Sequence, residues 1–532
     1  MSLSVLVIGS GLSAVGAIKA LRARGIRPTV IDRGEKLDSD RSDWVSAMAK
    51  KTPDQWDAAE RYKLSSNPTV TDSSAIPKKM LFGSDFFYGK STHDAPVHCE
   101  GNFPPFSYAL GGLSAGWGAA VLPPQACDVA DWPVSHDVLN EYCAKVLEEL
   151  PYSARDDGLS LDFPILSHRL NALNPSQSDL SLLDALKKSV AIKKGQLVFG
   201  QARLLVASED DEHSCKYCGQ CMSGCVYGSI YKAGNDIIKM SERGEIDYVS
   251  GHIVERIAEK NGQVKVTSRD HSGSVHHQKF DRVFIASGAA NSARIVLRSL
   301  DLYQRKVQML SRGGFVIPML SFKRLPSNWP NCNTQPGLFL EFRGKWLKHW
   351  VHVQISPQNE LLLQKFSVKE TDNQFIAKLK RALVARTVLL LVNYHSDHSG
   401  SYELWLASPE KNNDATSLHS IHKQSLPQWR IWFSSWFKLF SIFRRVGCIP
   451  LFPFAKLNSG AYHVGGTLPM KEQPKGNLET DTLGRVAAWK RVHVVDTATF
   501  PSLPGTTIGL LTMANAYRIV DQINWNLTSE ND

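Results

Sequence analysis

The segment Tyr462–Met470, YHVGGTLPM, places a histidine directly before two consecutive glycines. Histidine suits general-base work near neutral pH because its unperturbed pKa is about 6.5. Gly465 and Gly466 would leave space beside the imidazole. We therefore take His463 as a candidate base. The alternative is a histidine satisfied within the core, which is the commoner role for an isolated one.

A second group lies at the start of the chain, where residues 3–32 read as a strand, a glycine turn, a helix and a strand that ends in an acid. Gly9 permits the tight turn, Gly11 lets the backbone approach a pyrophosphate, and Ala14 allows close helix packing. The phosphates would lie at the start of the helix, where the N–H groups and the dipole favour negative charge. Asp32 would bind ribose hydroxyls. The pattern predicts a dinucleotide site but does not separate FAD from NAD.

A third group is a run of cysteines in the spacing C-x2-C-x2-C-x3-C. Its members are Cys215, Cys218, Cys221 and Cys225, and the other five of the nine cysteines are scattered singly. The spacing is that of bacterial ferredoxin ligands, although Val226 stands where proline is usual. An iron–sulfur cluster and a loop of free thiols both remain open as interpretations. Zinc ranks third, because no second cysteine pair or histidine partner accompanies the run.

Length and composition fit a multidomain protein with a large core, since the chain has 532 residues, 43% apolar and 21% charged. The net charge of +10 comes without a single basic tract or a nucleic-acid-binding motif. The first strand begins at residue 3 with no basic segment or cleavage site before it, so we expect a cytoplasmic protein. The apolar runs are too short to cross a bilayer.

The elements that must position these groups follow from periodicity. Residues 36–106 are polar and irregular, which suggests a lid-like insertion, and a glycine-rich stretch follows at 110–118. The run 283–297 reads as a strand, a turn at Gly288 and a helix that return to the nucleotide-binding sheet. Alternating strands between about 300 and 456, such as 350–355, indicate an antiparallel substrate-binding sheet.

With these elements placed, the chain resembles the glucose–methanol–choline (GMC) flavoprotein oxidoreductases over nearly its whole length. Seven elements match in family order: Gly9-x-Gly11-x-x-Ala14 with Asp32, Gly111-Gly112-x-Ser114-x-x-Trp117, Asp131-Trp-Pro133, the Cys215 segment, Ala286-Ser-Gly288-Ala289, Tyr462-His463-x-Gly465-Gly466-Thr467, and Val495-Asp496-x-x-x-Phe-Pro501.

The resemblance implies FAD as the cofactor. The positions it implies in cofactor binding are Gly9, Gly11, Ala14, Asp32, Gly111, Gly112, Ser114, Trp117, Val254, Gly288, Asp496 and Thr506. Gly111, Gly112 and Ser114 would follow the ribityl and pyrophosphate portion, and Val254 would pass near the adenine. Trp117 stands where pyranose-oxidising relatives carry tryptophan. Those relatives attach FAD through a preceding histidine, which is Gly116 here, so we expect FAD to be non-covalent.

His463 aligns with the family's catalytic histidine. The second catalytic position, normally histidine or asparagine, falls near Thr507, which can orient a substrate oxygen but is no base at neutral pH. The resemblance therefore implies oxidation of a CH–OH group to a ketone or aldehyde, with hydride transfer to flavin and His463 as the base.

The implied fold is α/β (α+β overall). It comprises a Rossmann-like FAD-binding domain, 1–299, with the insertion 36–106 and the Cys-rich segment 213–228, a mainly antiparallel-sheet substrate domain, 300–456, and a C-terminal return, 457–532, that carries the catalytic residues.

The substrate and the partners are less constrained. Analogy through Trp117 favours a sugar or glycan-like substrate, while a long-chain or sterol alcohol and a flavin-binding protein with lost turnover stay open. The electron acceptor is open among oxygen, a quinone and a protein. Residues 428–445 read as a basic, aromatic helix, which is either packed in its own domain or in peripheral contact with a membrane.

Overall fold

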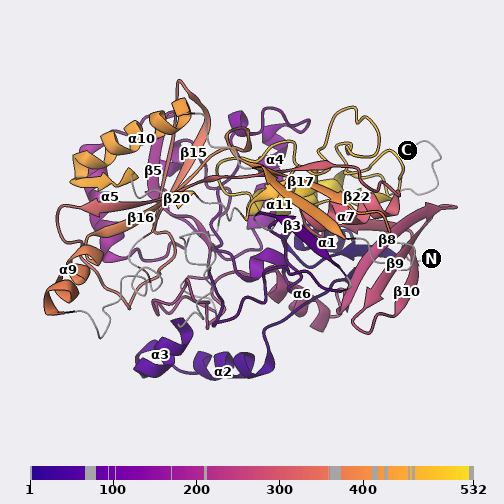
Figure 1. Ribbon diagram of the computed structural model, residues 1–532, viewed down its shortest axis with the longest axis horizontal. Coiled ribbons are helices and arrows are strands. Elements are labelled where there is room, and N and C mark those ends of the chain that lie inside the picture. The colour runs from indigo at the N-terminus through magenta and orange to yellow at the C-terminus, as the bar shows by residue number, and fades with distance from the viewer. Residues whose placement is uncertain are drawn as a thin grey trace.

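The computed structural model divides into a nucleotide-binding half at the right of Figure 1 and a half built on a large antiparallel sheet at the left. It describes residues 3–525 except 66–78, 94, 102–103, 169–170, 209–212, 357–358, 360–372, 410–416, 424–428, 453–455 and 458–461.

A five-stranded parallel sheet forms the centre of the nucleotide-binding half. Its order is β22 (Val492–Val494), β11 (Arg282–Ile285), β1 (Val5–Ile8), β2 (Thr29–Ile31) and β7 (Asp247–Val249). The short strands are almost entirely apolar because parallel sheets are covered on both faces. The covering helices are α1 (Leu12–Ala23), α6 (Ala233–Glu242), α7 (Ala289–Ser299) and α11 (Gly509–Gln522), and α4 (His136–Leu147) packs on α11. The predicted Rossmann-like domain is confirmed.

The last helix and the first are direct neighbours, which brings the C-terminal segment back to the nucleotide site. At Gly16 in α1 an added Cβ would lie 2.3 Å from the carbonyl oxygen of Met513 in α11. Such contact requires glycine at this crossing. A separate three-stranded sheet extends from the same half, with the order β10 (Val275–Phe280), β9 (Gln263–Asp270) and β8 (His252–Lys260).

Two antiparallel-rich sheets make up the predicted substrate domain, which is confirmed as a β-rich unit. The larger has the order β19 (Cys448–Pro450), β13 (Gly314–Ser321), β16 (Thr387–Asn393), β15 (Leu347–Ser356), β14 (Leu338–Gly344) and β5 (Leu197–Gln201), with β20 (Lys456–Leu457) beside β13. The smaller has the order β21 (Val464–Gly465), β12 (Val307–Ser311), β17 (Ser401–Leu406), β18 (Leu418–Lys423) and β3 (Val97–Glu100).

These sheets draw strands from outside the sequence range predicted for the domain. β5 and β3 come from the first 299 residues, and β21 comes from the C-terminal return. The segment 36–106 is also less irregular than expected, because it contains α2 (Ser39–Ala49), α3 (Ala58–Ser65) and β3. Asp38 begins α2 by accepting a hydrogen bond from the N–H of Arg41.

The remaining elements lie around the sheets. The helices are α5 (Gln177–Ser189), α9 (Gln374–Val384) and α10 (Trp429–Phe443), and a two-stranded sheet joins β4 (Tyr152–Ser153) to β6 (Leu204–Leu205). Helices α9 and α10 lie on the large-sheet half, at the left of Figure 1. No helix within the described part of the chain is long and apolar enough to span a membrane.

Candidate functional site

The glycine turn after β1 is built for close backbone approach. Gly9 has φ +105°, and a Cβ there would lie 2.5 Å from the carbonyl oxygen of Ala286 at the end of β11. Gly11 follows at the N-cap of α1, and Ala14 is fully buried in its first turn. The first N–H groups of the helix lie at this end, and phosphate binding there stays a prediction.

Asp32 lies just beyond β2, on the same edge of the sheet. Its carboxylate accepts a hydrogen bond from Ser10, and the Ser10 hydroxyl in turn accepts one from the N–H of Gly111 at 2.8 Å. Burial raises the pKa of Asp32 to about 7, although the Ser10 bond acts in the opposite direction. Strand β8 starts beside it, since the N–H of His252 donates to the Asp32 carbonyl, and Val254 is buried two residues later.

The second glycine pair meets the first. Gly111 has φ +87°, and a Cβ there would lie 2.6 Å from the nitrogen of Gly234 at the start of α6. A Cβ on Gly112 would lie 3.5 Å from the Cα of Gly11, so the two turns lie next to each other. Ser114 fixes the arrangement: its hydroxyl donates to the Gly111 carbonyl at 2.6 Å and accepts from the N–H of Ala233 at 3.0 Å.

Asp496 and Gly288 form a third part of this edge. Gly288 is the N-cap of α7 with φ +79°, and its N–H donates to the Asp496 carboxylate at 2.8 Å. The same carboxylate accepts hydrogen bonds from the Ser292 hydroxyl and the N–H of Ala498. Burial raises the pKa of Asp496 to about 6. The side chain thus holds two backbone segments together at the position where the cofactor's polar chain was expected.

Trp117 lies between the glycine-rich turn and the C-terminal helix. Its indole N–H donates to the carbonyl of Tyr231 at 2.6 Å. A Cβ on Gly509, the first residue of α11, would lie only 2.4 Å from the indole ring. The ring therefore occupies the space that glycine leaves at this helix end.

His463 sits at the start of β21, half-buried, with its Nδ1 buried and without a hydrogen-bond partner among the described residues. Burial lowers its pKa well below the usual value, and the charges of Arg312 and His352 lower it further. The imidazole is therefore neutral at pH 7, which is the form a base requires.

Arg312 connects His463 to the other predicted catalytic segment. Its guanidinium is buried and donates to the carbonyls of Gly505, at 3.1 Å, and Thr506, at 2.7 Å. Thr507 follows, and its hydroxyl accepts from the N–H of Leu122 at 2.8 Å, which leaves its own proton available. The Thr506 hydroxyl is buried and finds no partner in the described chain.

A polar row on the large sheet was missed from the sequence. Glu341 of β14 and His352 of β15 are cross-strand partners, both fully buried, and they are hydrogen-bonded to each other. Gln354 lies 3.0 Å from the other His352 nitrogen. Burial raises the pKa of Glu341 while His352 and Arg312 lower it, and its Oε2 has no hydrogen-bond partner among the described residues. His352 and Gln354 occupy alternate positions within the predicted strand 350–355. This alternation was the sequence signal from which the polar row could have been predicted.

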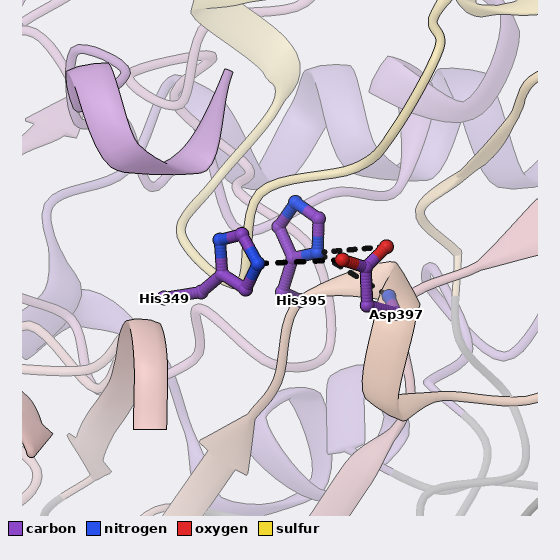
Figure 2. A group of neighbouring side chains, drawn as sticks. All are labelled: His349, His395 and Asp397. Atoms are coloured by element: carbon purple, nitrogen blue, oxygen red, sulfur yellow. Dashed lines mark hydrogen bonds and ion pairs between the residues drawn. The ribbon is translucent and has the colours of Figure 1, made fainter. Parts of the chain in front are cut away.

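His349, His395 and Asp397 lie side by side and form a histidine network (Figure 2). His349 pairs with Asp128 at 3.5 Å through Nδ1 and with Asp397 at 3.3 Å through Nε2. Burial lowers the pKa of His349, but these two carboxylates outweigh it and the pKa rises to about 9. His395 stacks on His349, and its Nε2 donates to the Asp128 carbonyl at 3.2 Å.

The ligand atoms of His349, His395 and Asp397 all lie within 4.8 Å of one another, close enough for a metal ion. However, the two rings are 3.8 Å apart and tilted by only 7°, so their lone pairs run side by side and do not converge. Nδ1 of His395 also accepts a hydrogen bond from the Asp397 N–H. We therefore assign the network to ion pairing.

The histidine network also contacts the loop 503–507. Ser396 lies between His395 and Asp397 in the sequence. Its N–H donates to the Leu503 carbonyl at 2.9 Å, and the N–H of Leu503 donates to the Ser396 hydroxyl at 2.9 Å. At Gly505 a Cβ would lie 2.6 Å from the Trp350 carbonyl oxygen. Residues 503–505 therefore pack directly against residues next to the network.

The cysteine run forms a loop whose four thiols all line one cavity. The other lining residues are Val206, Lys216, Gln220, Tyr227, Ser229, Ile230 and Asn333. The cysteines are present as thiols. Burial raises the pKa of Cys215. The sequence-predicted metal set is thus brought together in space.

Comparison with known proteins gives one line of support. No protein-family model and no curated protein matches the chain. Among solved structures, pyridoxine 4-oxidase from Mesorbium loti aligns over 98% of this chain and 99% of its own, with a TM-score of 0.58 and 13% sequence identity. At this identity the likeness shows a shared overall fold.

Proposed function

We propose that this protein is an FAD-dependent oxidoreductase that converts a CH–OH group to a ketone or aldehyde, with His463 as the base. The observation that carries the proposal is the position of His463 beside Arg312 and the Thr506 segment. The Nδ1 of His463 has no hydrogen-bond partner among the described residues, and Arg312 links the His463 backbone to the Thr506 carbonyl beside a dinucleotide fold. The full-length likeness to an enzyme named as an oxidase supports the same reaction class.

The residues present fit FAD. Gly11 and Gly112 bring two backbone turns close together, and Asp32 lies at the strand end where a ribose would bind. The buried Thr506 hydroxyl lacks a partner in the described chain, as expected of a group that bonds a ligand. A Cβ at Gly116 would lie 2.3 Å from the Phe87 ring, so the position has no room for an attaching histidine, and we propose non-covalent FAD.

In the proposed reaction, FAD when bound supplies the acceptor for the hydride. The substrate hydroxyl donates its proton to His463, and the two electrons of the C–H bond leave with the hydride, so one carbonyl forms. Thr507 donates its free proton to the substrate oxygen and orients it. Arg312 holds the His463 and Thr506 segments at a fixed separation.

For the substrate we propose a sugar or glycan-like molecule. Arg312 Nε and Glu341 Oε2 are buried and have no partner among the described residues, and Arg312 lies near enough to His463 for its charge to lower the pKa of that histidine. A molecule with several hydroxyls would satisfy such groups, whereas a hydrocarbon would leave them unpaired at a cost of about 1–3 kcal/mol each.

A second candidate, an amphipathic or lipid-linked alcohol, is favoured by helix α10. Its inner face is buried through Ile431, Leu439 and Ile442, as the packed interpretation predicted. Its outer face nevertheless exposes Trp429 at 68% and Phe437 at 60%. The helix contains no acidic residue, so charge complementarity points to an anionic bilayer as the surface that this face contacts.

The reaction class is tested by anaerobic addition of a panel of sugars and long-chain alcohols while flavin absorbance is recorded. We expect wild-type protein to bleach with at least one member. His463→Ala should retain yellow FAD and bleach at least about 100-fold more slowly. Full-rate bleaching in this variant would refute the base assignment, and an absence of bound FAD in wild-type protein would refute the proposed cofactor.

The membrane contact is tested by co-sedimentation with vesicles of anionic or neutral phospholipid. The double variant Trp429→Ala/Phe437→Ala should bind anionic vesicles less than wild-type protein does. Tyr62→Ala is the matched control, because Tyr62 is an equally exposed aromatic residue on α3. Equal binding by all three proteins would rule out α10 as the contact.

A further inference from the structure

Helix α9 turns its apolar side toward solvent. Phe375, Leu379 and Leu383 recur at i, i+4 and i+8 and therefore share one face of the helix. Phe375 is 74% exposed and Leu379 is 59% exposed. Leu383 is exposed as well, and so is Ile376, which adjoins the same face. A surface helix ordinarily packs such a stripe onto the core. In α9 the stripe has no cover among the described residues.

The opposite side of α9 fixes the helix to the large sheet. Ala377 and Val384 are its buried residues. The Thr387 hydroxyl, at the start of β16, donates to the Leu383 carbonyl at 2.8 Å. The Asn373 side chain caps the first turn. The apolar stripe therefore cannot turn inward without breaking the contacts that hold the helix.

Basic residues border the stripe on both sides. Lys378 and Lys380 flank Leu379 in the sequence, so they project from opposite sides of the helix. Arg381 is exposed, and the helix contains no acidic residue. Lysine stems can lie along apolar surface while their ammonium groups reach a negatively charged partner. An exposed apolar face with cationic borders is the pattern of helices that lie in a membrane interface.

The end of a neighbouring strand extends this surface. Phe322 directly follows β13 and is 62% exposed, and Lys323 and Arg324 after it are exposed too. The N–H of Ser321 donates to the Arg386 carbonyl at 2.8 Å, which places the strand end next to the C-terminal end of α9. Figure 1 shows α9 at the outer end of the large-sheet half, away from the nucleotide-binding half. We call α9 together with residues 322–324 the α9 surface.

We propose that the α9 surface docks on a bilayer of anionic phospholipid, with α9 lying in the plane of the interface and its apolar stripe below the headgroups. The stripe runs along one helix, so all of it can reach the acyl chains at the same depth. The α9 surface carries five basic residues and no acidic one. Charge complementarity therefore selects an anionic bilayer over a neutral one. It also disfavours a second copy of this chain, whose own α9 surface would repel the first. The inference does not rest on the proposed reaction, and it concerns a helix other than α10.

The test is co-sedimentation of the full chain with vesicles of phosphatidylcholine, either alone or with about 30% phosphatidylserine. Phe375→Gln/Leu379→Gln removes the two most exposed apolar residues of the stripe, and glutamine preserves helix propensity. This variant should bind the anionic vesicles at least about 10-fold more weakly than wild-type protein does. The matched control is Tyr62→Gln/Val275→Gln, which also replaces one exposed aromatic and one exposed aliphatic residue, here on α3 and β10. The control should bind like wild-type protein.

Hydrogen–deuterium exchange with and without anionic vesicles gives a readout that needs no variant. The amides of residues 373–385 should exchange more slowly in vesicle-bound wild-type protein, and those of residues 58–65 in α3 should not change. Trp429→Ala/Phe437→Ala, which alters α10, should keep the slowed exchange at 373–385 when lipid is saturating.

Equal binding of anionic vesicles by Phe375→Gln/Leu379→Gln and wild-type protein would overturn the proposal. So would unchanged exchange at 373–385 in vesicle-bound protein, or a failure of wild-type protein to bind vesicles of either composition. Dimerisation of wild-type protein in vesicle-free solution, if the same double variant abolishes it in analytical ultracentrifugation, would assign the α9 surface to a second copy of the chain. If the variant is not folded by circular dichroism, the exchange measurement on wild-type protein decides.

Discussion

The main-chain N–H of Arg312 donates to the carbonyl oxygen of His463 at 2.9 Å. One residue therefore fixes the backbone of the proposed base and, through its guanidinium, the loop before Thr507. Burial lowers the pKa of Arg312 to about 9, and Glu341 opposes that shift, so the side chain is still positively charged at neutral pH. This charge disfavours a second proton on His463.

Replacing Arg312 by glutamine should raise the pKa of His463, because the repelling charge is removed. A base is active when deprotonated, so the acid limb of kcat/KM should move to higher pH, and the rate at pH 6 should fall more than the rate at pH 8. The measurement is a pH–rate profile with saturating FAD. Arg305→Gln, an exposed change, should leave the profile in place. An unmoved acid limb in a folded, FAD-bound Arg312→Gln variant would contradict the coupling.

Valine substitution should affect stability at Thr507 and FAD affinity at Thr506. Thr507→Val leaves the buried Leu122 N–H unpaired and should lower the free energy of unfolding of FAD-free protein by about 1–3 kcal/mol. Thr506→Val removes a hydroxyl with no partner in the described chain, so stability should hold while FAD affinity falls. Urea unfolding and FAD titration distinguish the two. Equal destabilisation by both would show that the Thr506 hydroxyl is bonded within the protein.

FAD affinity should depend on the ionisation of Asp32. Burial raises its pKa from 3.8 to about 7 without the cofactor, and ribose hydroxyls would bond the charged form. Binding should therefore strengthen as pH rises from 6 to 8, and Asp32→Asn should bind more weakly with a flatter pH dependence. Because the folded-state pKa is raised, the stability of FAD-free protein should decrease as pH rises from about 4 through 7. FAD titrations at four pH values check the first expectation, and urea unfolding checks the second. An unchanged slope in Asp32→Asn would assign the dependence to another group.

His349 should make stability sensitive to alkaline pH. Its pKa is raised to about 9 despite burial, since Asp128 and Asp397 favour the imidazolium. This contribution is complete below about pH 6.5 and is lost as pH rises through 9. His349→Gln should remove the decline in melting temperature between pH 7 and 9.5. His276→Gln should change it little, because the His276–Asp270 pair is solvent-exposed. A lower melting temperature of wild-type protein in EDTA would instead identify a metal in the network.

The βαβ unit was predictable because its information is local. Gly9, Gly11 and Asp32 lie within one short segment, and each has a distinct steric or polar task. The proximity of the four cysteines from Cys215 to Cys225 was also predictable, because their short spacing keeps them within one loop around the cavity. Helix α10 buries one face and exposes apolar residues on the other, because its apolar residues surround the helix, and its contact with a membrane stays a prediction.

Long-range pairing explains what the sequence did not reveal. Arg312 appears as one of many basic residues until β12 and β21 pair and place it at His463. Glu341 and His352 become partners only through the register of β14 with β15. Likewise, β5 enters the large sheet at a sequence distance of more than a hundred residues from its neighbour β14, which no periodicity in either strand specifies.

The contact between Trp117 and Gly509 imposes a constraint on how this sequence can diverge. The indole fills the volume that any β-carbon at position 509 would enter. A descendant with alanine at 509 would need a smaller side chain at 117, and the reverse substitution alone would open a void at the first turn of α11. Substitutions at positions 117 and 509, which are nearly four hundred residues apart in the sequence, should therefore occur together. Each half of such an exchange should be tolerated less well than both together.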